Sequence, residues 1–304
     1  MVYVITGATS FIGIELIYYL LERNHKVFAV CRSNSNRISS LPEGTEVVTA
    51  DMSDYGSLKD KIPFADVFIN LAWGGTGHDR RDVVEIQNEN IKFTTEAFFS
   101  ACKMKCRLFV EAGSQAEYGS TIKVQSEDDE CIPFSEYGKA KLRVQEELFS
   151  LSEIQNIKYI HLRIFSIFGE NDHSWTLVMS AIDKMLNNEV VDLSPCTQNW
   201  NFLYVKDAVR QIVFLCDYAI KSNVFKHEIY NIASDDSRQL KNFVERIKEL
   251  VDSTSILNYG AVIPHNQVSL QPNMNKTKSI VRNLCEYSFD EVITRILETK
   301  KKNL

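Results

Sequence analysis

The sequence predicts an α/β protein built on a doubly wound parallel sheet, followed by a smaller C-terminal lobe. Short apolar runs of strand length alternate with amphipathic helical segments as far as about residue 165, which is typical of β-α-β units. Beyond about residue 234 the pattern changes to helical segments such as Leu240–Val251 and Phe289–Leu297. With 304 residues, the chain is long enough for one large domain or a domain and a half.

Composition argues against several functional classes. The formal net charge is −6 and the only basic cluster is Lys300–Lys302, so nucleic-acid binding is not expected. No apolar run is long enough to cross a membrane, and a first strand starting at residue 2 leaves no room for a signal peptide. The seven cysteines lack C-x-x-C spacing, which favours free thiols in a reducing cytoplasm over disulfides or a metal site.

The first strand and the turn after it carry the clearest motif. Val2–Ile5 is β-branched and aromatic, and from Phe11 onward apolar residues recur at helical spacing. Gly7 lies in the turn, where glycine adopts conformations that other residues resist, and Gly13 lets the helix lie close to the strand. The free N–H groups of the helix would bind a dinucleotide pyrophosphate, although such a turn also occurs for structural reasons alone. The expected cofactor contacts are Gly7, Thr9, Ser10, Phe11, Ile12 and Gly13.

The segment Thr6–Gly13 also resembles a family signature. It is similar to the T-G-x-x-G-x-x-G loop of the extended short-chain dehydrogenases/reductases, the NAD-dependent epimerase/dehydratase type. Ser10 stands where the signature has its middle glycine. The resemblance implies a Rossmann-type fold and a nicotinamide cofactor. Ser10 adds a Cβ near the pyrophosphate, and its hydroxyl can also donate to a phosphate oxygen.

The residues after the second predicted strand, Lys26–Cys31, indicate which cofactor is used. In this architecture an acidic residue at that point binds the ribose diol of NAD, whereas an arginine accommodates the 2′-phosphate of NADP. The loop that follows contains Arg32 and Arg37 and no carboxylate. The sequence therefore favours NADP(H) bound through Arg32, with NAD as the alternative. Two surface arginines in a polar loop would explain the same pattern.

Two further strands are predicted at Val47–Ala50 and Val67–Ala72. In the family that the chain resembles, an Asp–hydrophobic pair after the third strand contacts adenine, which implies this role for Asp51 and Met52; a helix-capping aspartate is the alternative. The fourth strand is apolar, as expected for a parallel strand covered on both faces. It ends in a glycine-rich loop at the sheet edge where ligands bind. The cofactor contacts expected there are Leu71, Ala72 and Trp73.

A serine, a tyrosine and a lysine then follow in an order that suggests catalysis. Ser114 follows the predicted strand Arg107–Ala112, and Ser135 opens a helix that carries Tyr137 and Lys141. Residues four apart share a helix face, and a positive charge beside a phenol favours its ionised form, which suits a general acid or base. A lone Y-x-x-x-K is common by chance. Together with the glycine loop, however, the three residues resemble the short-chain dehydrogenase triad, in which the tyrosine and the lysine also contact the cofactor.

Two later segments resemble family motifs in which single residues differ. Lys158–Gly169, the predicted sixth strand and its exit, is similar to L-R-x-x-N-x-Y-G-P, with Ser166 at the asparagine; His161 within it is expected to be a core histidine. Gln198–Asp207 is similar to Q-x-R-D-F-x-Y-V-x-D, with Trp200 at an arginine that often meets the sugar-nucleotide phosphate. The substrate contacts that the resemblance implies are Ser114, Gln115, Ser166 and Trp200.

The resemblance implies two domains and a nucleotide-sugar substrate. The expected NAD(P)-binding Rossmann domain covers residues 1–169 and 204–233, and the expected substrate lobe covers 170–203 and 234–304. A homodimer formed through helices near 83–103 and 137–152 is also implied.

The reaction can be narrowed further. The family's 4,6-dehydratases carry an Asp-Glu pair directly after the catalytic serine or threonine. Gln115 and Ala116 occupy those places here, and Glu117 is one place too late, so dehydration is not expected. The favoured reaction is NADPH-dependent reduction of a nucleotide-linked 4-keto-6-deoxyhexose. A 4-epimerase with tightly held NAD is the alternative, and a non-catalytic NADP-binding sensor is less expected because Tyr137 and Lys141 are both present.

Overall fold

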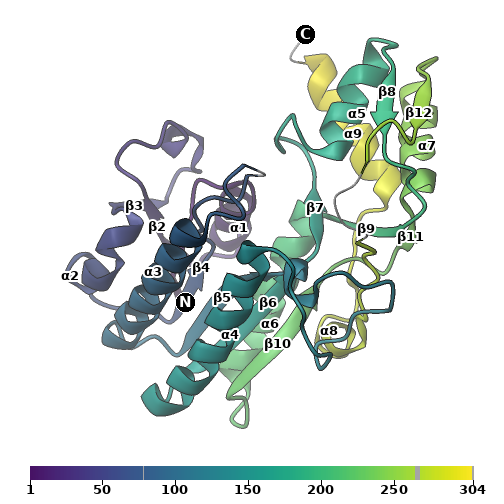
Figure 1. Cartoon of the computed structure of the whole chain (residues 1–304). Helices are drawn as coiled ribbons and strands as arrows, with labels where there is room; N and C mark the ends of the chain where they lie inside the picture. Colours follow the sequence, from purple (N-terminus) through teal and green to yellow (C-terminus); the bar gives the residue numbers. More distant parts are fainter. Residues whose placement is uncertain (78, 264–267, 303–304) are drawn as a thin grey trace.

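The computed structural model describes residues 1–77, 79–263 and 268–302 (Figure 1). Its largest element is a parallel sheet of seven strands in the order β10-β6-β5-β4-β1-β2-β3. The order reverses between β1 and β4, and ligands of such sheets bind beyond the carboxyl ends of the strands at this point. The strands are β1 Val2–Thr6, β2 Lys26–Cys31, β3 Glu46–Thr49, β4 Val67–Asn70, β5 Leu108–Ser114, β6 Lys158–Ile164 and β10 His227–Ile232.

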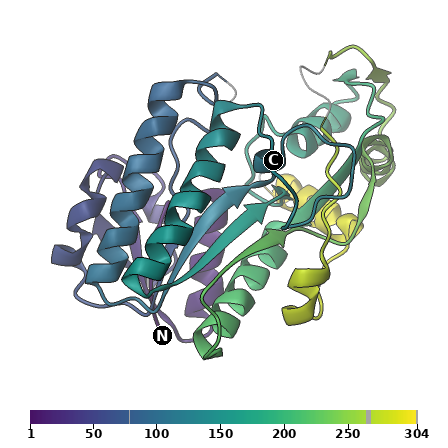
Figure 2. The ribbon, with the colours of Figure 1, turned by 60° about the horizontal axis from the view of Figure 1, so that its bottom comes forward.

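Helices cover both faces of this sheet (Figure 2). On one face α3 (Val84–Lys103) and α4 (Glu136–Gln155) lie side by side, with the single turn α2 (Leu58–Lys61) near them. On the other face α1 (Phe11–Leu21) packs against α6 (Val205–Lys221). The predicted doubly wound α/β class is therefore confirmed.

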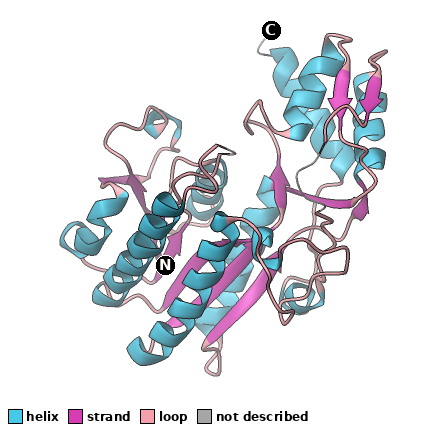
Figure 3. Cartoon of the chain, viewed as in Figure 1, coloured by secondary structure: helices cyan, strands magenta, loops and turns pink. Residues whose placement is uncertain are grey.

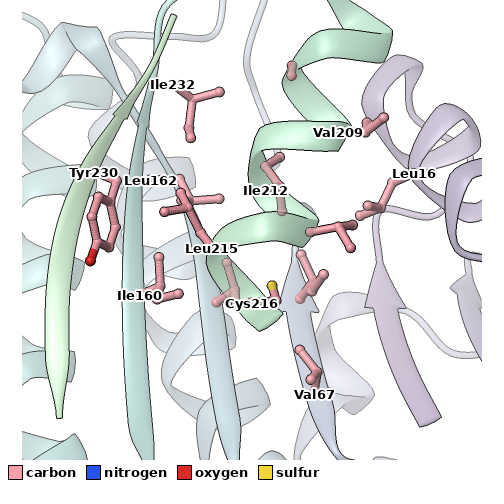
Figure 4. Packing of buried hydrophobic residues seen from close by; sticks show 14 of the residues in the cluster. Leu16, Val67, Ile160, Leu162, Val209, Ile212, Leu215, Cys216, Tyr230 and Ile232 are labelled. Atoms are coloured by element: carbon pink, nitrogen blue, oxygen red, sulfur yellow. The ribbon is translucent and has the colours of Figure 1, made fainter. Parts of the chain in front are cut away.

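Alternate strand residues pack against the helices of opposite faces. On the α6 side, Val67, Ile160 and Leu162 of the sheet belong to one buried cluster with Ile212 and Leu215 of the helix (Figure 4). Burial of side chains of this size is the main favourable contribution to folding. This cluster anchors α6 against the sheet.

On the α3–α4 side, four buried polar side chains form a row near the strand ends. Thr6, Asn70, Glu111 and His161 are paired in register across β1, β4, β5 and β6, and each is at most 1% exposed. We call these four residues the polar row. Asn70 corrects the expectation of a fully apolar fourth strand. Two residues earlier in the same strands lies an apolar layer of Val4, Phe68, Phe109 and Tyr159.

The remaining elements form a second, smaller group beyond the ends of β5 and β6 (Figure 3). It contains a three-stranded sheet in the order β11-β9-β7 and a two-stranded sheet of β12 and β8, and its core includes the edge-to-face and tilted rings of Phe202, Phe243 and Phe289. The short helix α8 (Asn275–Ile280) instead packs against α6 and β10. The elements of the group are β7 Ser166–Phe168, α5 Leu177–Leu186, β8 Val191–Leu193, β9 Asn199–Tyr204, β11 Ser237–Gln239, α7 Leu240–Val251, β12 Leu257–Tyr259 and α9 Phe289–Lys302.

Several predicted strands begin or end one or two residues from their predicted bounds, and two elements differ by more than that. The segment expected to be one strand breaks at Phe165, so that β6 belongs to the large sheet and β7 to the small one. Helix α9 continues past Leu297 to Lys302, and Lys300 Nζ in its last turn donates to Asp183 of α5 at 2.5 Å. All seven cysteines are free thiols. No helix in the described ranges is long and apolar enough to cross a membrane.

Candidate active site

The glycine loop is closed by tight backbone contacts. Gly7 has a φ of +63°, and a Cβ at this position would lie 2.8 Å from the backbone nitrogen of Ala72. A Cβ on Gly13 would lie 2.5 Å from the carbonyl oxygen of Gly7. Both glycines are thus required by the approach of β1, α1 and the β4 exit to one another. This approach brings Leu71 and Ala72 next to the loop.

Ser10 has a defined structural role at the start of α1. It is the N-cap residue, and its Oγ accepts from the backbone N–H of Gly13 at 3.0 Å. That bond satisfies one of the free donors of the first turn. The N–H groups of Phe11 and Ile12, in the same turn, have no acceptor within the helix. The open helix end therefore keeps two backbone donors, and the Ser10 hydroxyl hydrogen, for an anion.

The loop after β2 lies against the glycine loop. Ser35 Oγ donates to Thr9 Oγ1 at 3.2 Å and joins the two. Arg32 is exposed, and within the described ranges neither it nor Arg37 forms an ion pair with a carboxylate. Both guanidinium groups are therefore available to an external anion.

Asp51 and Met52 follow β3 at the start of a 3₁₀ helix, Met52–Ser57. Asp51 is exposed and is the N-cap residue of this helix. Its backbone N–H donates to Asp54 Oδ2 at 3.2 Å. Met52 is partly buried against the α3–α4 side of the core. Asp51 is thus a helix-capping residue, which was one of the two roles that the sequence allowed. Its side chain is also exposed, so the predicted contact with the cofactor stays a prediction.

Ser114 is the last residue of β5, and its backbone is fixed by Glu117. Its N–H donates to Glu117 Oε1 at 2.7 Å, while its Oγ accepts from the backbone N–H of Ala116 at 3.1 Å. Within the described residues the hydroxyl hydrogen has no acceptor, so it is available to donate to a substrate. Ser114 is 8% exposed, so it is open only toward the cavity described below.

Glu117 points into the interior rather than toward a substrate. Its carboxylate lies 3.0 Å from His161 Nε2 and accepts from Arg163 Nε at 2.9 Å. Burial opposes ionisation, but His161, Arg163 and the Ser114 N–H together hold the pKa of Glu117 below its usual value. His161 is fully buried, in agreement with the expected core histidine. Glu117 therefore supports the β5 exit.

Helix α4 lies unusually close to that exit. Its N-cap Ser135 accepts from the backbone N–H of Gly138 at 3.1 Å. A Cβ on Gly138 would lie only 2.5 Å from the carbonyl oxygen of Ala116. The close approach carries Tyr137, in the first turn of α4, to the cavity that Ser114 also lines.

Lys141, one turn further along α4, faces the sheet. Its Nζ donates to Glu111 Oε1 at 3.1 Å and to the carbonyl oxygen of Ala112 at 2.5 Å, and it lies 3.4 Å from the centre of the Trp73 ring. Its side chain is 3% exposed. In the described part of the chain no hydrogen bond joins Lys141 to Tyr137, although the two residues share a helix face as expected.

A cavity of about 210 Å³ lies at the carboxyl edge of the sheet. Four of its lining residues were predicted from the sequence as site residues, and the described lining includes no carboxylate. Trp73 lies just outside, with its ring 6.0 Å from that of Tyr137 and its Nε1 bonded to Gln87. No group of three or more His, Cys, Asp or Glu among the described residues is placed to hold a metal ion. The cavity is lined by Thr76, Arg81, Ser114, Gln115, Tyr137, Ile164, Phe165 and Ser166.

Arg81 lines this cavity and was not predicted from the sequence. Its guanidinium lies 4.4 Å from the centre of the Tyr137 ring, a distance at which a cation is attracted to an aromatic face. Its carbonyl oxygen accepts from the buried Gln87 Nε2 at 3.2 Å, and the neighbouring Asp82 accepts from the N–H of Glu136 at 2.9 Å. The available signal was a pair of arginines, Arg80 and Arg81, soon after the glycine-rich β4 exit.

Trp200 lies away from the cavity. It sits in β9 opposite Arg238 of β11, and its ring packs 6.4 Å from that of Phe202 in the second group of elements. The structure therefore brings Ser114, Gln115 and Ser166 together and leaves Trp200 separate. A substrate contact by Trp200 remains a prediction.

Comparison with known proteins adds independent information. The model of the NAD dependent epimerase/dehydratase family matches residues 3–233. The chain is 22% identical to CDP-abequose synthase of Salmonella muenchen over 97% of each protein. It is 25% identical to dTDP-4-dehydro-6-deoxyglucose reductase of Escherichia coli, with 86% of this chain and 85% of that protein covered.

Solved structures show the same fold. A UDP-N-acetylglucosamine 4-epimerase from Methanobrevibacter ruminantium M1, in complex with UDP-N-acetylmuramic acid, matches with a TM-score of 0.88 at 20% identity, over 99% of this chain and 98% of that one. A UDP-glucuronic acid 4-epimerase from Bacillus cereus, in complex with UDP-glucuronic acid and NAD, matches with a TM-score of 0.85 at 20% identity over the whole of both chains.

Proposed function

The chain belongs to the NAD-dependent epimerase/dehydratase family, and from this premise we propose that it reduces the 4-keto group of a nucleotide-linked 6-deoxyhexose with NADPH. The observation that carries the choice of cofactor is Arg32, an exposed cation directly after β2 that forms no ion pair with the described residues, at the place where an NAD site would have an acid. The relative from Escherichia coli, named a dTDP-4-dehydro-6-deoxyglucose reductase, supports the choice of reaction.

The residues present fit a nicotinamide dinucleotide. The N–H groups of Phe11 and Ile12 at the open end of α1 suit its pyrophosphate, and Arg32 suits the 2′-phosphate of NADP. The further contacts that we propose are with Gly7, Thr9, Ser10, Gly13, Asp51, Met52, Leu71, Ala72, Trp73, Tyr137 and Lys141.

In the proposed mechanism, three side chains act on a carbonyl group. When bound, NADPH supplies the hydride that reduces the carbonyl carbon. Tyr137 donates its phenolic proton to the carbonyl oxygen, so that the ketone becomes a secondary alcohol. Ser114, whose hydroxyl hydrogen is free, donates a hydrogen bond to the same oxygen. Lys141 supplies positive charge next to this pair and contacts the nicotinamide ribose.

Arg81 is proposed as a further substrate contact. Its guanidinium faces a cavity that has no lining carboxylate, and within the described residues it forms no ion pair. A guanidinium in such a place binds oxygen atoms that carry negative charge. Gln115 and Ser166 line the same cavity and are proposed to contact the sugar.

The second group of elements is proposed to be the substrate lobe. Apart from β7, its elements come from the two stretches 170–203 and 234–304, as the family resemblance implies, with residues 1–169 and 204–233 as the cofactor domain. Its position beyond the ends of β5 and β6 (Figure 1) supports this division. We also propose that the chain forms a homodimer through α3 and α4. The proposed location is the cytoplasm, because the seven free thiols favour a reducing compartment.

A 4-epimerase that retains NAD is the second candidate. Matching solved structures include 4-epimerases, one of them in complex with NAD. An epimerase returns the hydride to the same sugar, so it has no need to exchange its cofactor. A sensor that binds NADP without turnover is the third candidate, and the presence of Tyr137 and Lys141 speaks against it.

A direct assay separates these candidates. Purified protein is incubated with NADPH and a CDP- or dTDP-linked 4-keto-6-deoxyhexose, and the loss of NADPH absorbance is followed. We expect stoichiometric oxidation of NADPH, slowed by about a hundredfold or more in Tyr137→Phe, which keeps the ring but lacks the acidic hydroxyl. Interconversion of 4-epimers without net oxidation, together with NAD that co-purifies, would establish the epimerase instead.

A further inference from the structure

Glu111 is a carboxylate in the middle of a strand that is covered on both faces. Its side chain is fully buried, a position where an unpaired charge would strongly destabilise the fold. Asn70 Nδ2 donates to its Oε2 at 2.7 Å and Lys141 Nζ to its Oε1 at 3.1 Å. One oxygen is therefore held by a neutral amide and the other by an ammonium group.

Among the described contacts of the Lys141 ammonium, Glu111 is the one acidic group. The other two contacts, the carbonyl oxygen of Ala112 and the ring of Trp73, are neutral. A lysine side chain is flexible and has no single preferred position. The position of the Lys141 Nζ is therefore determined by these three contacts. Only Glu111 offers a negative charge, which favours the protonated form of a buried amine.

The same carboxylate connects Lys141 to the glycine loop. Asn70 Oδ1 accepts from Thr6 Oγ1 at 2.5 Å, and Thr6 immediately precedes Gly7. Three of the polar-row residues therefore form a continuous set of hydrogen bonds from the start of the loop to Lys141. One end of this set adjoins the proposed pyrophosphate loop, and the other end, Lys141, is a proposed cofactor contact.

We propose that Glu111 is the positioning residue of Lys141: its carboxylate fixes the ammonium group at the cofactor site and keeps it protonated during turnover. The inference rests on the proposed function, in which Lys141 contacts the nicotinamide ribose. Glu111 acts through Lys141 and touches neither substrate nor cofactor.

The surroundings of the pair offer Lys141 no substitute for Glu111. His161 is the register partner of Glu111 on β6, and its ring nitrogens are occupied by Tyr159 and Glu117. Among the described residues, none of these side chains forms a hydrogen bond with Lys141 Nζ. Tyr159 and His161 on β6 interact electrostatically with Glu111, Glu117 after β5 is bonded to His161, and Tyr137 lies one turn before Lys141 on α4.

The test is Glu111→Gln, which keeps the size of the side chain and removes its charge. We expect kcat/KM to fall by about tenfold or more at neutral pH. The alkaline limit of activity should move down by at least about one pH unit, since a buried ammonium without its carboxylate loses its proton more readily. NADPH affinity, titrated by nicotinamide fluorescence, should weaken over the same pH range. Glu111→Asp keeps the charge and should retain the wild-type alkaline limit while lowering kcat.

Ser100→Ala is the matched control. It removes another buried hydrogen bond on the α3 side, from Ser100 Oγ to the carbonyl oxygen of Tyr55 at 2.5 Å, away from the cavity. It should lower stability and leave the pH profile in place. If the pH dependence of Glu111→Gln has the same shape and limits as that of the wild type, the proposal is overturned, whatever the absolute rate of the variant.

Two further outcomes are distinguished. If Glu111→Gln does not fold, Glu111→Asp decides, and an unchanged kcat with unchanged NADPH affinity would overturn the role of Glu111. A wild-type protein that binds neither NADPH nor NADH would refute the proposed function, and the role of Glu111 with it. Wild-type binding with no change in Glu111→Gln would refute the role of Glu111 alone.

Discussion

At the scale of single residues, the two cations nearest Tyr137 differ in what they are free to bind. The ammonium of Lys141 is enclosed by Glu111 and Trp73. The guanidinium of Arg81 is only partly buried and lies over the Tyr137 ring. We therefore expect a substrate in the cavity to meet Arg81 directly, whereas the Lys141 ammonium is held by its neighbours in the protein.

Arg81→Met should weaken substrate binding. Methionine keeps much of the apolar volume and loses the charge, so the charge-assisted bonds, roughly 1.5–3 kcal/mol, are lost. We expect KM for the keto sugar to rise by about tenfold or more, with little change in NADPH affinity. Arg80→Met is the matched control, because Arg80 is exposed and outside the cavity. Equal KM values for the two variants would exclude a substrate contact by Arg81.

Arg32→Asp should reverse the choice of cofactor. The wild type is expected to bind NADPH more tightly than NADH by roughly tenfold or more, the effect of one charge-assisted phosphate contact. An aspartate would repel the 2′-phosphate and accept bonds from the ribose diol of NADH. Fluorescence titration with both cofactors measures the ratio, and Arg37→Asp in the same loop should change it less. Tighter binding of NADH by the wild type would contradict the assignment.

At the scale of elements, the contact between α4 and the β5 exit sets the position of the cavity. Gly138→Ala places a Cβ 2.5 Å from the carbonyl oxygen of Ala116. Alanine improves helix propensity by about 1 kcal/mol, but overpacking costs roughly 1–3 kcal/mol, so the variant should be less stable overall. The neighbouring Tyr137 must shift, and kcat should fall.

Gly56→Ala tests whether this loss is specific to the close contact. A Cβ at Gly56 meets nothing within 4 Å, so the free energy of unfolding should change by no more than about 0.5 kcal/mol. Thermal unfolding and turnover of both variants provide the comparison. Similar losses at the two positions would show that the approach of α4 to the β5 exit is not what matters.

Periodicity predicted the elements well, but it carries no information about which strands pair side by side. The bounds of α7 agree with the helical spacing of Leu240–Val251, and apolar runs located the strands of the large sheet. The polar row could not be predicted, because Asn70, Glu111 and His161 each look isolated in their own strand. Only strand pairing places them side by side, and pairing over long sequence distances leaves no periodic signal.

The candidate site could be predicted in part: its residues at strand ends could, and its loop residue Arg81 could not. Ser114, Gln115 and Ser166 lie at or just after the carboxyl ends of β5 and β6, and parallel strands bring these ends to one edge, so a shared cavity could be expected. Arg81 lies in a loop whose path depends on Gln87 and on Asp82. Such tertiary contacts are invisible in the order of residues.

At the scale of the whole molecule, two buried glutamates give stability opposite pH dependences. The pKa of Glu117 is lowered, so its contribution is fully present above the unfolded value of about 4.3 and is lost as pH falls through the lower folded pKa. Burial raises the pKa of Glu111, with Lys141 opposing. Ionisation of Glu111 therefore reduces stability as pH rises above its unfolded pKa.

Glu117→Gln should reveal the first of these effects. Removal of the charge that His161 and Arg163 share should lower the free energy of unfolding by about 3–5 kcal/mol at neutral pH. The difference from the wild type should begin to shrink below about pH 4, where Glu117 becomes protonated in the unfolded chain, and should be lost once pH falls through the lower pKa of the folded state. Urea unfolding at several pH values measures both. A difference that stays constant with pH would show that Glu117 contributes only packing.

The position of β10 at the edge of the large sheet has a consequence for synthesis on the ribosome. Its partner β6 ends at Ile164, but β10 begins only at His227. At a translation rate of roughly 5–20 residues per second, about 3–13 s pass between the synthesis of the end of β6 and the start of β10. During that interval a nascent chain exposes unpaired backbone groups beside an incomplete core, the condition that invites association between chains. Chaperone dependence of this protein should therefore be greatest for chains arrested between these two strands.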